Sequence, residues 1–175
     1  MGHIGAMVMF LKAAGGYGFG VVAQEDTTVD SIKNILVAVD LHAGSEDVAR
    51  VAAGFAEAFS AKLYFLHVDR ANPEIFGDPD IPDDRDVVAS QVKASHQELQ
   101  GLRDKMTPSG VEAVALQIHG QTVQKIISEA TRLDIDQMVV GFHRDRLHHL
   151  LSGDVTKSVL NYAPCPVVVV PPPKR

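Results

Sequence analysis

The residues best suited to bind a ligand lie in the last third of the chain, where two glycines flank a polar loop. An apolar run with two β-branched valines, residues 138–140, leads into Gly141, and Gly153 stands just before a predicted helix. Glycines at such positions let backbone N–H groups approach an anion at a helix N-terminus. The loop therefore predicts a site for a phosphate-bearing ligand.

Two residues of this loop act on an anion in opposite directions. Arg144 carries a guanidinium, which can chelate phosphate oxygens. Asp154 carries a carboxylate, which only accepts hydrogen bonds and repels a phosphate by about 4 kcal/mol at ~4 Å and an effective dielectric near 20. Asp154 is also a favoured N-cap that would occupy the helix N–H groups itself. A Mg²⁺ ion held by Asp154 would reverse the sign of its effect.

Other chemistries find little support in the sequence. It contains no GxSxG, P-loop or kinase motif. Cys165 lies between two prolines before an apolar run, where an inert core thiol is expected. The histidines of the C-terminal half lack metal-ligand spacing; they are His119, His143, His148 and His149. We expect no catalytic residue and no metal site, and at most a weak ATPase activity.

Composition narrows the function classes further. The chain has 175 residues, a 46% hydrophobic fraction and a formal net charge of −6, which argues against nucleic acid and anionic membranes as partners. No apolar run reaches the ~18 residues of a membrane span. The single cysteine excludes an intrachain disulfide and fits a cytoplasmic protein.

The first 31 residues differ from the rest. They are rich in glycine and methionine and then become polar, so we predict an N-terminal extension of unknown role at 1–31 and a single domain at 32–175. Residues 16–19, Gly-Tyr-Gly-Phe, are similar to the aromatic-glycine patch of cold-shock proteins. The segment is too short for a barrel and has no basic flank, so nucleic-acid binding is not predicted.

From residue 34 onward, apolar strand patterns alternate with helical patterns. Asp40, Val68 and Gly141 each stand at the carboxyl end of a predicted strand. Alternation of this kind predicts a parallel sheet covered by helices on both faces, with ligands beyond the carboxyl ends of the strands. The predicted strands are 35–39, 63–68, 111–118, 138–140 and 167–170, and the predicted helices follow Ser45 as N-cap, span about 87–106, surround 123–130 and span about 154–162, with a polar loop over 72–86.

These pieces together resemble the universal stress protein family. The resemblance covers residues 34–171, about four fifths of the chain, and rests on the order and spacing of its pieces rather than on any one of them. The matching segments are 35–40, Leu66-His67-Val68, Ile118-His119-Gly120, 134–141, 153–156 and 163–170.

The resemblance implies an adenine nucleotide alpha hydrolase-like fold, a three-layer α/β/α domain with a five-stranded parallel sheet in the order 3-2-1-4-5. It also implies a homodimer paired through the final strand, and a Rossmann-like site for ATP, with Mg²⁺, or AMP in those members that bind nucleotide. The ribose would contact Asp40 beside Val39, and the backbone of Val68 would read the adenine. The phosphates would lie along Gly141, Arg144, Gly153, Asp154, Val155 and Thr156.

The chain departs from the family's phosphate-loop pattern in two positions. Arg144 stands in place of a glycine, Asp154 stands in place of a serine or threonine, and the loop is one residue shorter. Two interpretations remain open. The protein is either a stress-response regulator that binds an adenine nucleotide, or a nucleotide-independent dimeric interaction module whose phosphate site is blocked by Asp154.

Overall fold

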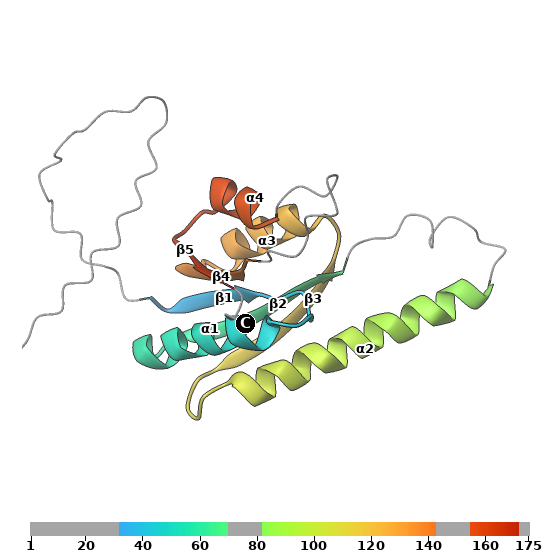
Figure 1. The fold of residues 1–175 in the computed structure, drawn as a ribbon, viewed down its shortest axis with the longest axis horizontal. Helices are drawn as coiled ribbons and strands as arrows, with labels where there is room; N and C mark the ends of the chain where they lie inside the picture. The colour runs from blue at the N-terminus through green and yellow to red at the C-terminus, as the bar shows by residue number, and fades with distance from the viewer. Residues whose placement is uncertain (1–31, 70–81, 143–154, 172–175) are drawn as a thin grey trace, which may run out of the picture. The chain divides into compact units, whose positions relative to one another are not determined.

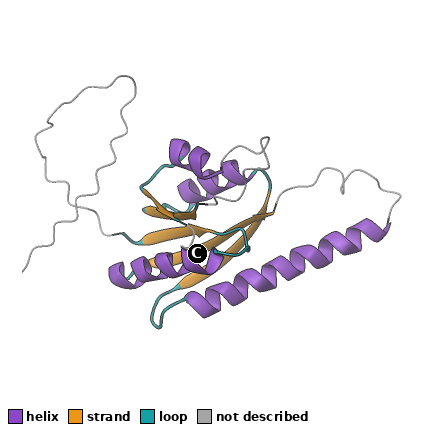
Figure 2. Cartoon of the chain, viewed as in Figure 1, coloured by secondary structure: helices purple, strands orange, loops and turns teal. Residues whose placement is uncertain are grey.

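A computed structural model describes residues 32–69, 82–142 and 155–171, within which strands and helices alternate (Figures 1 and 2). The elements are β1 (Asn34–Ala38), α1 (Ser45–Phe59), β2 (Lys62–Asp69), α2 (Pro82–Met106), β3 (Ala113–His119), α3 (Thr122–Arg132), β4 (Gln137–Gly141), α4 (Val155–Tyr162) and β5 (Val167–Val170). The predictions for residues 1–31, for most of the loop at 72–86 and for Asp154 as the helix start fall outside the described residues.

The five strands form one parallel sheet in the order β3-β2-β1-β4-β5, which confirms the predicted fold. Strand β1 lies in the middle, with Val37 aligned with Phe65 of β2 on one side and with Val139 of β4 on the other. The chain moves outward from β1 in one direction through β2 and β3, and later in the other through β4 and β5. The switch point of the sheet is therefore between β1 and β4.

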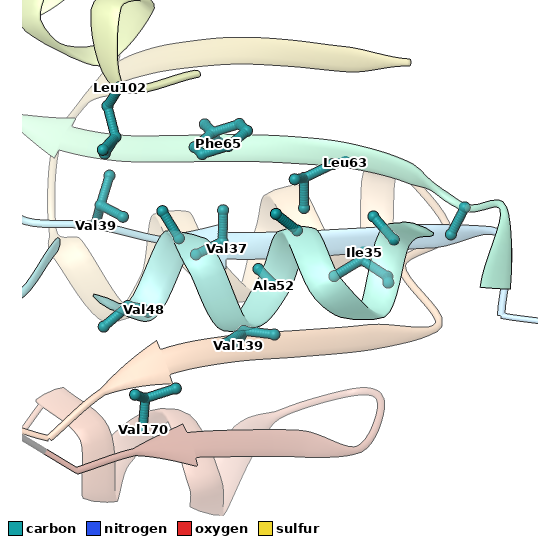
Figure 3. Packing of buried hydrophobic residues seen from close by; sticks show 14 of the residues in the cluster. Ile35, Val37, Val39, Val48, Ala52, Leu63, Phe65, Leu102, Val139 and Val170 are labelled. Atoms are coloured by element: carbon teal, nitrogen blue, oxygen red, sulfur yellow. The ribbon is translucent and has the colours of Figure 1, made fainter. Parts of the chain in front are cut away.

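Helices cover both faces of the sheet, with α1 and α2 on one face and α3 and α4 on the other (Figure 1). Alternate strand residues point to opposite faces. Val37, Phe65 and Val139 pack beneath α1, as Figure 3 shows, whereas Leu36 and Met138 pack beneath the other helix pair. Burial on both faces explains why the central strands are continuous apolar runs.

The start of α1 differs from the prediction. Ser45 is the first residue of the helix rather than its N-cap, and Gly44 is the N-cap with a φ of 104°. A left-handed residue is needed there, and glycine adopts it without steric cost. The Ser45 hydroxyl instead donates to the Asp40 carboxylate at 3.1 Å.

Two other predicted boundaries were wrong. Helix α2 begins at Pro82, so the polar segment expected to be a loop as far as residue 86 is partly helical. Proline is well suited to a first helical turn because its missing N–H would have no partner there. Strand β3 begins at Ala113, two residues later than predicted.

A carboxylate fixes the amino end of β1. One carboxylate oxygen of Asp136 accepts from the backbone N–H groups of Lys33, at 2.8 Å, and Asn34, at 2.9 Å. The Asp136 N–H donates in turn to the Asn34 carbonyl at 2.9 Å. Charge-assisted bonds to backbone amides are among the stronger hydrogen bonds in proteins, so this contact sets the register between β1 and β4.

Candidate functional site

The strand ends predicted to hold a ligand meet at one edge of the sheet. Strands β1, β2 and β4 are neighbours and parallel, so their carboxyl ends point the same way. The structure thereby brings Asp40, Val68 and Gly141 to the same edge, two residues beyond β1, one residue before the end of β2 and at the end of β4. Ligands of open parallel sheets bind at this edge, beside the switch point.

Asp40 is held by the loop that follows it. Its Oδ1 accepts from the His42 backbone N–H at 3.2 Å and from the Ser45 hydroxyl at 3.1 Å. The His42 ring nitrogen Nδ1 lies 2.9 Å from the Asp40 carbonyl oxygen. These contacts fix the orientation of the carboxylate, which pre-organises it to accept a hydrogen bond from a ligand hydroxyl.

Val39 and Val68 present mainly backbone to this edge. The Val39 N–H donates to the Leu66 carbonyl at 2.9 Å, and its side chain is 8% exposed in the core under α1. The Val68 side chain packs against the core on the opposite face. Their side chains thus serve packing. The Val39 peptide groups contact Leu66 and His67, which leaves the peptide groups of Val68 as the part of this pair that can meet a ligand.

The end of β4 is tied to the start of α4. The Thr156 hydroxyl donates to the Gly141 carbonyl at 2.9 Å, and the Phe142 N–H donates to the Val170 carbonyl at 2.9 Å. Thr156 therefore uses its proton within the protein and offers an incoming phosphate no donor from its side chain in this conformation. Val155 begins α4 and packs against the core of that face.

The other phosphate-loop residues lie outside the described residues. Arg144, Gly153 and Asp154 fall in the segment 143–154. Their predicted roles stay predictions, and the described part of the site comprises the proposed adenine and ribose contacts together with both anchors of the loop.

A polar group that we did not single out from the sequence lies beside Val68. His67 and Asp69 contact each other, with 3.2 Å between Nε2 and Oδ1, and Gln117 donates to the second Asp69 oxygen at 2.6 Å. The alternation of polar and apolar residues at the end of β2 was the available signal. Residues two apart on a strand share a face, so His67 and Asp69 had to be neighbours.

A hollow of about 560 Å³ lies between the start of α1 and the last turns of α2. Its lining includes His42 and Ser45, which hold Asp40, but among the described residues none from β2 or β4, so it adjoins the Asp40 loop without spanning the switch point. Its cations Arg50 and Lys105 are each paired, with Asp47 at 2.6 Å and with Glu46 at 2.6 Å. Paired cations are poorly placed to attract a phosphate, and we do not assign the nucleotide to this hollow.

Cys165 shows the properties of a structural thiol. Burial, followed by the negative charge of Asp136, raises the pKa of Cys165 to about 11. The thiol is therefore protonated near neutral pH and a weak nucleophile. Among the described residues no cluster of three or more histidine, cysteine, aspartate or glutamate side chains has a metal-binding arrangement. None of the helices in that part of the chain combines the length and apolar composition needed to cross a bilayer.

The comparison with protein families extends over nearly all of this fold. The model of the universal stress protein family matches residues 31–171. The chain belongs to this family. Among curated relatives, the universal stress protein A homolog of Pasteurella multocida is 30% identical over 141 residues, covering 79% of this chain and 96% of that protein.

Solved structures of universal stress proteins share the fold. One, described as a universal stress protein in complex with cAMP, has a TM-score of 0.62 at 18% identity and covers 82% of this chain and 100% of its own. Another, the universal stress protein from Archaeoglobus fulgidus in complex with dAMP, has a TM-score of 0.52 at 21% identity and covers 79% of this chain and 98% of its own. At such identities the likeness concerns the fold.

Proposed function

We propose that this universal stress protein family member is a regulatory protein of the stress response that binds an adenine nucleotide at the switch point of its sheet. The observation that carries the proposal is the convergence of Asp40, Val68 and Gly141 at one edge. The complexes of two structural relatives with cAMP and dAMP support an adenine nucleotide as the ligand class.

The proposed contacts follow from the chemistry available at the edge. The oriented Asp40 carboxylate accepts from a ribose hydroxyl, next to the Val39 peptide. The peptide groups of Val68 pair with the adenine edge. The phosphates of ATP or AMP lie between Gly141 and the start of α4, with Arg144, Gly153, Asp154, Val155 and Thr156 around them, and with Mg²⁺ in the case of ATP.

A nucleotide-independent interaction module is the second candidate. The hydrogen bond from Thr156 to the Gly141 carbonyl favours it, because it links the end of β4 to the start of α4 without a ligand. Asp154 would then cap its own helix and fill the anion position. In both candidates the protein acts by binding rather than by catalysis, although the first leaves room for a weak ATPase activity.

The test of nucleotide binding is calorimetric titration of the full chain with ATP and with AMP, each with and without Mg²⁺. We expect Asp40→Asn to weaken AMP binding by about tenfold to a hundredfold, the usual worth of a hydrogen bond to a charged group. Asp47→Asn is the matched control, since Asp47 pairs with Arg50 on the exposed surface of α1. Equal effects of both substitutions, or no binding at millimolar ligand, would reject the proposed site.

We also propose a homodimer paired through β5, the edge strand of the sheet. Met138 donates to the Pro166 carbonyl and Phe142 to the Val170 carbonyl. Because alternate residues of a strand direct their hydrogen-bonding groups to opposite sides, Val168 faces β4, and Val169 faces outward. The outward groups of β5 point away from β4 and would meet a second copy of the strand in the proposed pairing.

Because Val169 faces away from β4, Val169→Pro tests the proposed dimer. Proline there removes the outward N–H while keeping the inward bonds to β4. We expect a monomer in sedimentation velocity with a retained fold, whereas Val168→Pro should instead lower stability by breaking the pairing with β4. A Val169→Pro protein that still sediments as a dimer would place the interface elsewhere.

Two further assignments from the sequence belong to this proposal. We take residues 1–31 as an extension and 32–175 as the functional domain, which is supported by the start of the family match at residue 31. We place the protein in the cytoplasm, a compartment in which the free thiol of Cys165 stays reduced.

A further inference from the structure

A histidine joins the carboxyl ends of β1 and β2. Nδ1 of His67 lies 2.9 Å from the Val39 carbonyl oxygen, and Nε2 lies 3.2 Å from a carboxylate oxygen of Asp69. The His67 and Asp69 side chains are only 13% and 18% exposed. Water therefore competes poorly for either contact, and the protein must supply the protons that both contacts need.

The two partners of the ring set a requirement on its protons. A carbonyl oxygen and a carboxylate oxygen both only accept hydrogen bonds, whereas a neutral imidazole has a single N–H. Neutral His67 can thus satisfy Val39 or an ionised Asp69, but not both. The two contacts form together only when the His67–Asp69 pair holds two protons, either both on the ring or one on each side chain.

We infer that His67 and Asp69 form a proton-completed brace, in which the uptake of one proton completes the side-chain link from Asp69 through His67 to the Val39 carbonyl. His67 is then a positioning residue for the edge of the sheet at which the nucleotide is proposed to bind. The inference rests on the proposed function for the identity of the ligand, whereas the brace itself can be tested without a ligand.

Asp69 is too well anchored to adapt to a neutral ring. Its second carboxylate oxygen accepts from the Gln117 amide at 2.6 Å, and the same amide donates to the Val92 carbonyl of α2 at 3.1 Å. The Asp69 carbonyl accepts from the Gly120 N–H at 3.0 Å. The brace therefore responds to a proton through the ring of His67 and not through movement of Asp69.

Charge decides which contact is lost when the pair gives up its proton. A carboxylate is the stronger acceptor, so the remaining ring proton stays on Nε2, facing Asp69. Nδ1 then presents a lone pair to the Val39 carbonyl oxygen, and the contact turns repulsive. When the pair gives up its proton, the Val39 carbonyl therefore loses its contact with His67, while the Val39 N–H keeps its bond to the Leu66 carbonyl at 2.9 Å.

Other charged and titratable groups stand on the elements next to the brace. Several of these side chains already have other partners, and their charges contribute to the electrostatic environment of the brace. They are Asp40 and His42 in the loop after β1, Glu46 and Asp47 in the first turn of α1, His119 at the end of β3 with Nδ1 3.7 Å from Asp69, and Lys93, His96, Glu98 and Lys105 on α2.

The first test follows backbone amides by NMR of the ligand-free full chain between about pH 5.5 and pH 8.5. The Val39 carbonyl and the Asp40 N–H belong to one peptide group, so losing the contact on the carbonyl must shift the Asp40 amide signal. We expect the Asp40 amide and the ring of His67 to titrate together. A ring that carries a single proton throughout, or an Asp40 amide that ignores the ring, would overturn the brace.

Asp69→Asn is the decisive variant because it keeps the shape of the side chain and changes the number of protons that the two contacts of His67 require. The introduced amide can donate to Nε2 while accepting from Gln117, so neutral His67 can donate Nδ1–H to Val39. We expect the Asp40 amide to become insensitive to pH. His119→Gln is the control, since His119 is 53% exposed and its Nδ1 lies 3.7 Å from Oδ2 of Asp69, the oxygen that does not face His67, so it should leave the response intact.

If the ring of wild-type His67 keeps both protons over the whole pH range, comparing wild type with Asp69→Asn still tests the brace. The brace then predicts that Asp69→Asn releases the second proton within the range, and a variant ring that also keeps both protons would contradict it. A response that persists unchanged in Asp69→Asn would likewise show that Asp69 plays no part in it.

The consequence for the ligand is tested with adenosine, which has no phosphate to titrate near neutral pH. We expect its affinity to fall about threefold to tenfold from about pH 6 to about pH 8, the worth of one hydrogen bond, and to stay constant in Asp69→Asn. Absence of adenosine and nucleotide binding with an intact NMR response would reject the proposed function and keep the brace. Binding that is equally pH-dependent in both proteins would reject the coupling.

Discussion

Replacing Asp154 with serine is expected to raise the affinity for ATP by about a hundredfold or more. The substitution removes a charge that repels a phosphate by about 4 kcal/mol at ~4 Å, and it supplies a hydroxyl able to donate to the phosphate. Calorimetric titration of Asp154→Ser and wild type with ATP measures the difference. AMP, with a single phosphate, should gain less than ATP.

Asp104→Ser provides the control for this comparison, since it makes the same change of charge on an exposed turn of α2 where Asp104 pairs with Arg103. Unchanged weak binding in Asp154→Ser would contradict a blocking role for Asp154. A loss of affinity that appears only with Mg²⁺ would instead show that Asp154 holds the metal ion of the bound nucleotide.

The second large effect concerns the strand that positions the site. Phe65→Ala is expected to lower the free energy of unfolding by about 3–5 kcal/mol, because Phe65 is fully buried between β1, β3 and the helices above it. Urea denaturation should show a lower midpoint with an unchanged slope. Unfolding would also disrupt the candidate site, since His67 and Val68 belong to the same strand as Phe65.

Phe59→Ala is the matched control for the core. Phe59 stacks on Phe55 at 6.3 Å, but it is 46% exposed at the end of α1. We expect a loss well below that of Phe65→Ala, since its ring leaves less apolar surface to return to water. Similar losses for the two substitutions would mean that the packing under α1 is not the main source of stability.

The fold could be predicted from the sequence because the composition of its strands reflects their burial. The runs around Val37, Val139 and Val168 are apolar without interruption, which only a sheet covered on both faces explains. The strand order came from the family resemblance. Boundaries were less predictable, as at Ser45, because a left-handed turn at Gly44 depends on how the loop returns to the sheet.

The sequence predicted which residues lie at the site better than it predicted which hydrogen bonds they form. Asp40 and Gly141 follow from the end of a strand pattern, which is a one-dimensional feature. The bonds of Thr156 to Gly141 and of His67 to Val39 join residues 15 and 28 positions apart. Such pairings depend on which strands become neighbours and how their registers align, and local sequence patterns carry little of that information.

The position of β1 at the centre of the sheet also constrains the order in which the domain can fold. Its contact with β2 spans a short stretch of chain, whereas the bonds between Asn34 and Asp136 join residues 102 positions apart. Closing the longer loop costs more chain entropy, about 0.6 kcal/mol for each doubling of its length, so β1, β2 and β3 can associate before β4 and β5 do. Until then one edge of β1 stays open, as a strand able to pair with another chain. The switch point between β1 and β4 is then completed last, and a ligand bound there would favour the finished sheet over its partly assembled forms by mass action.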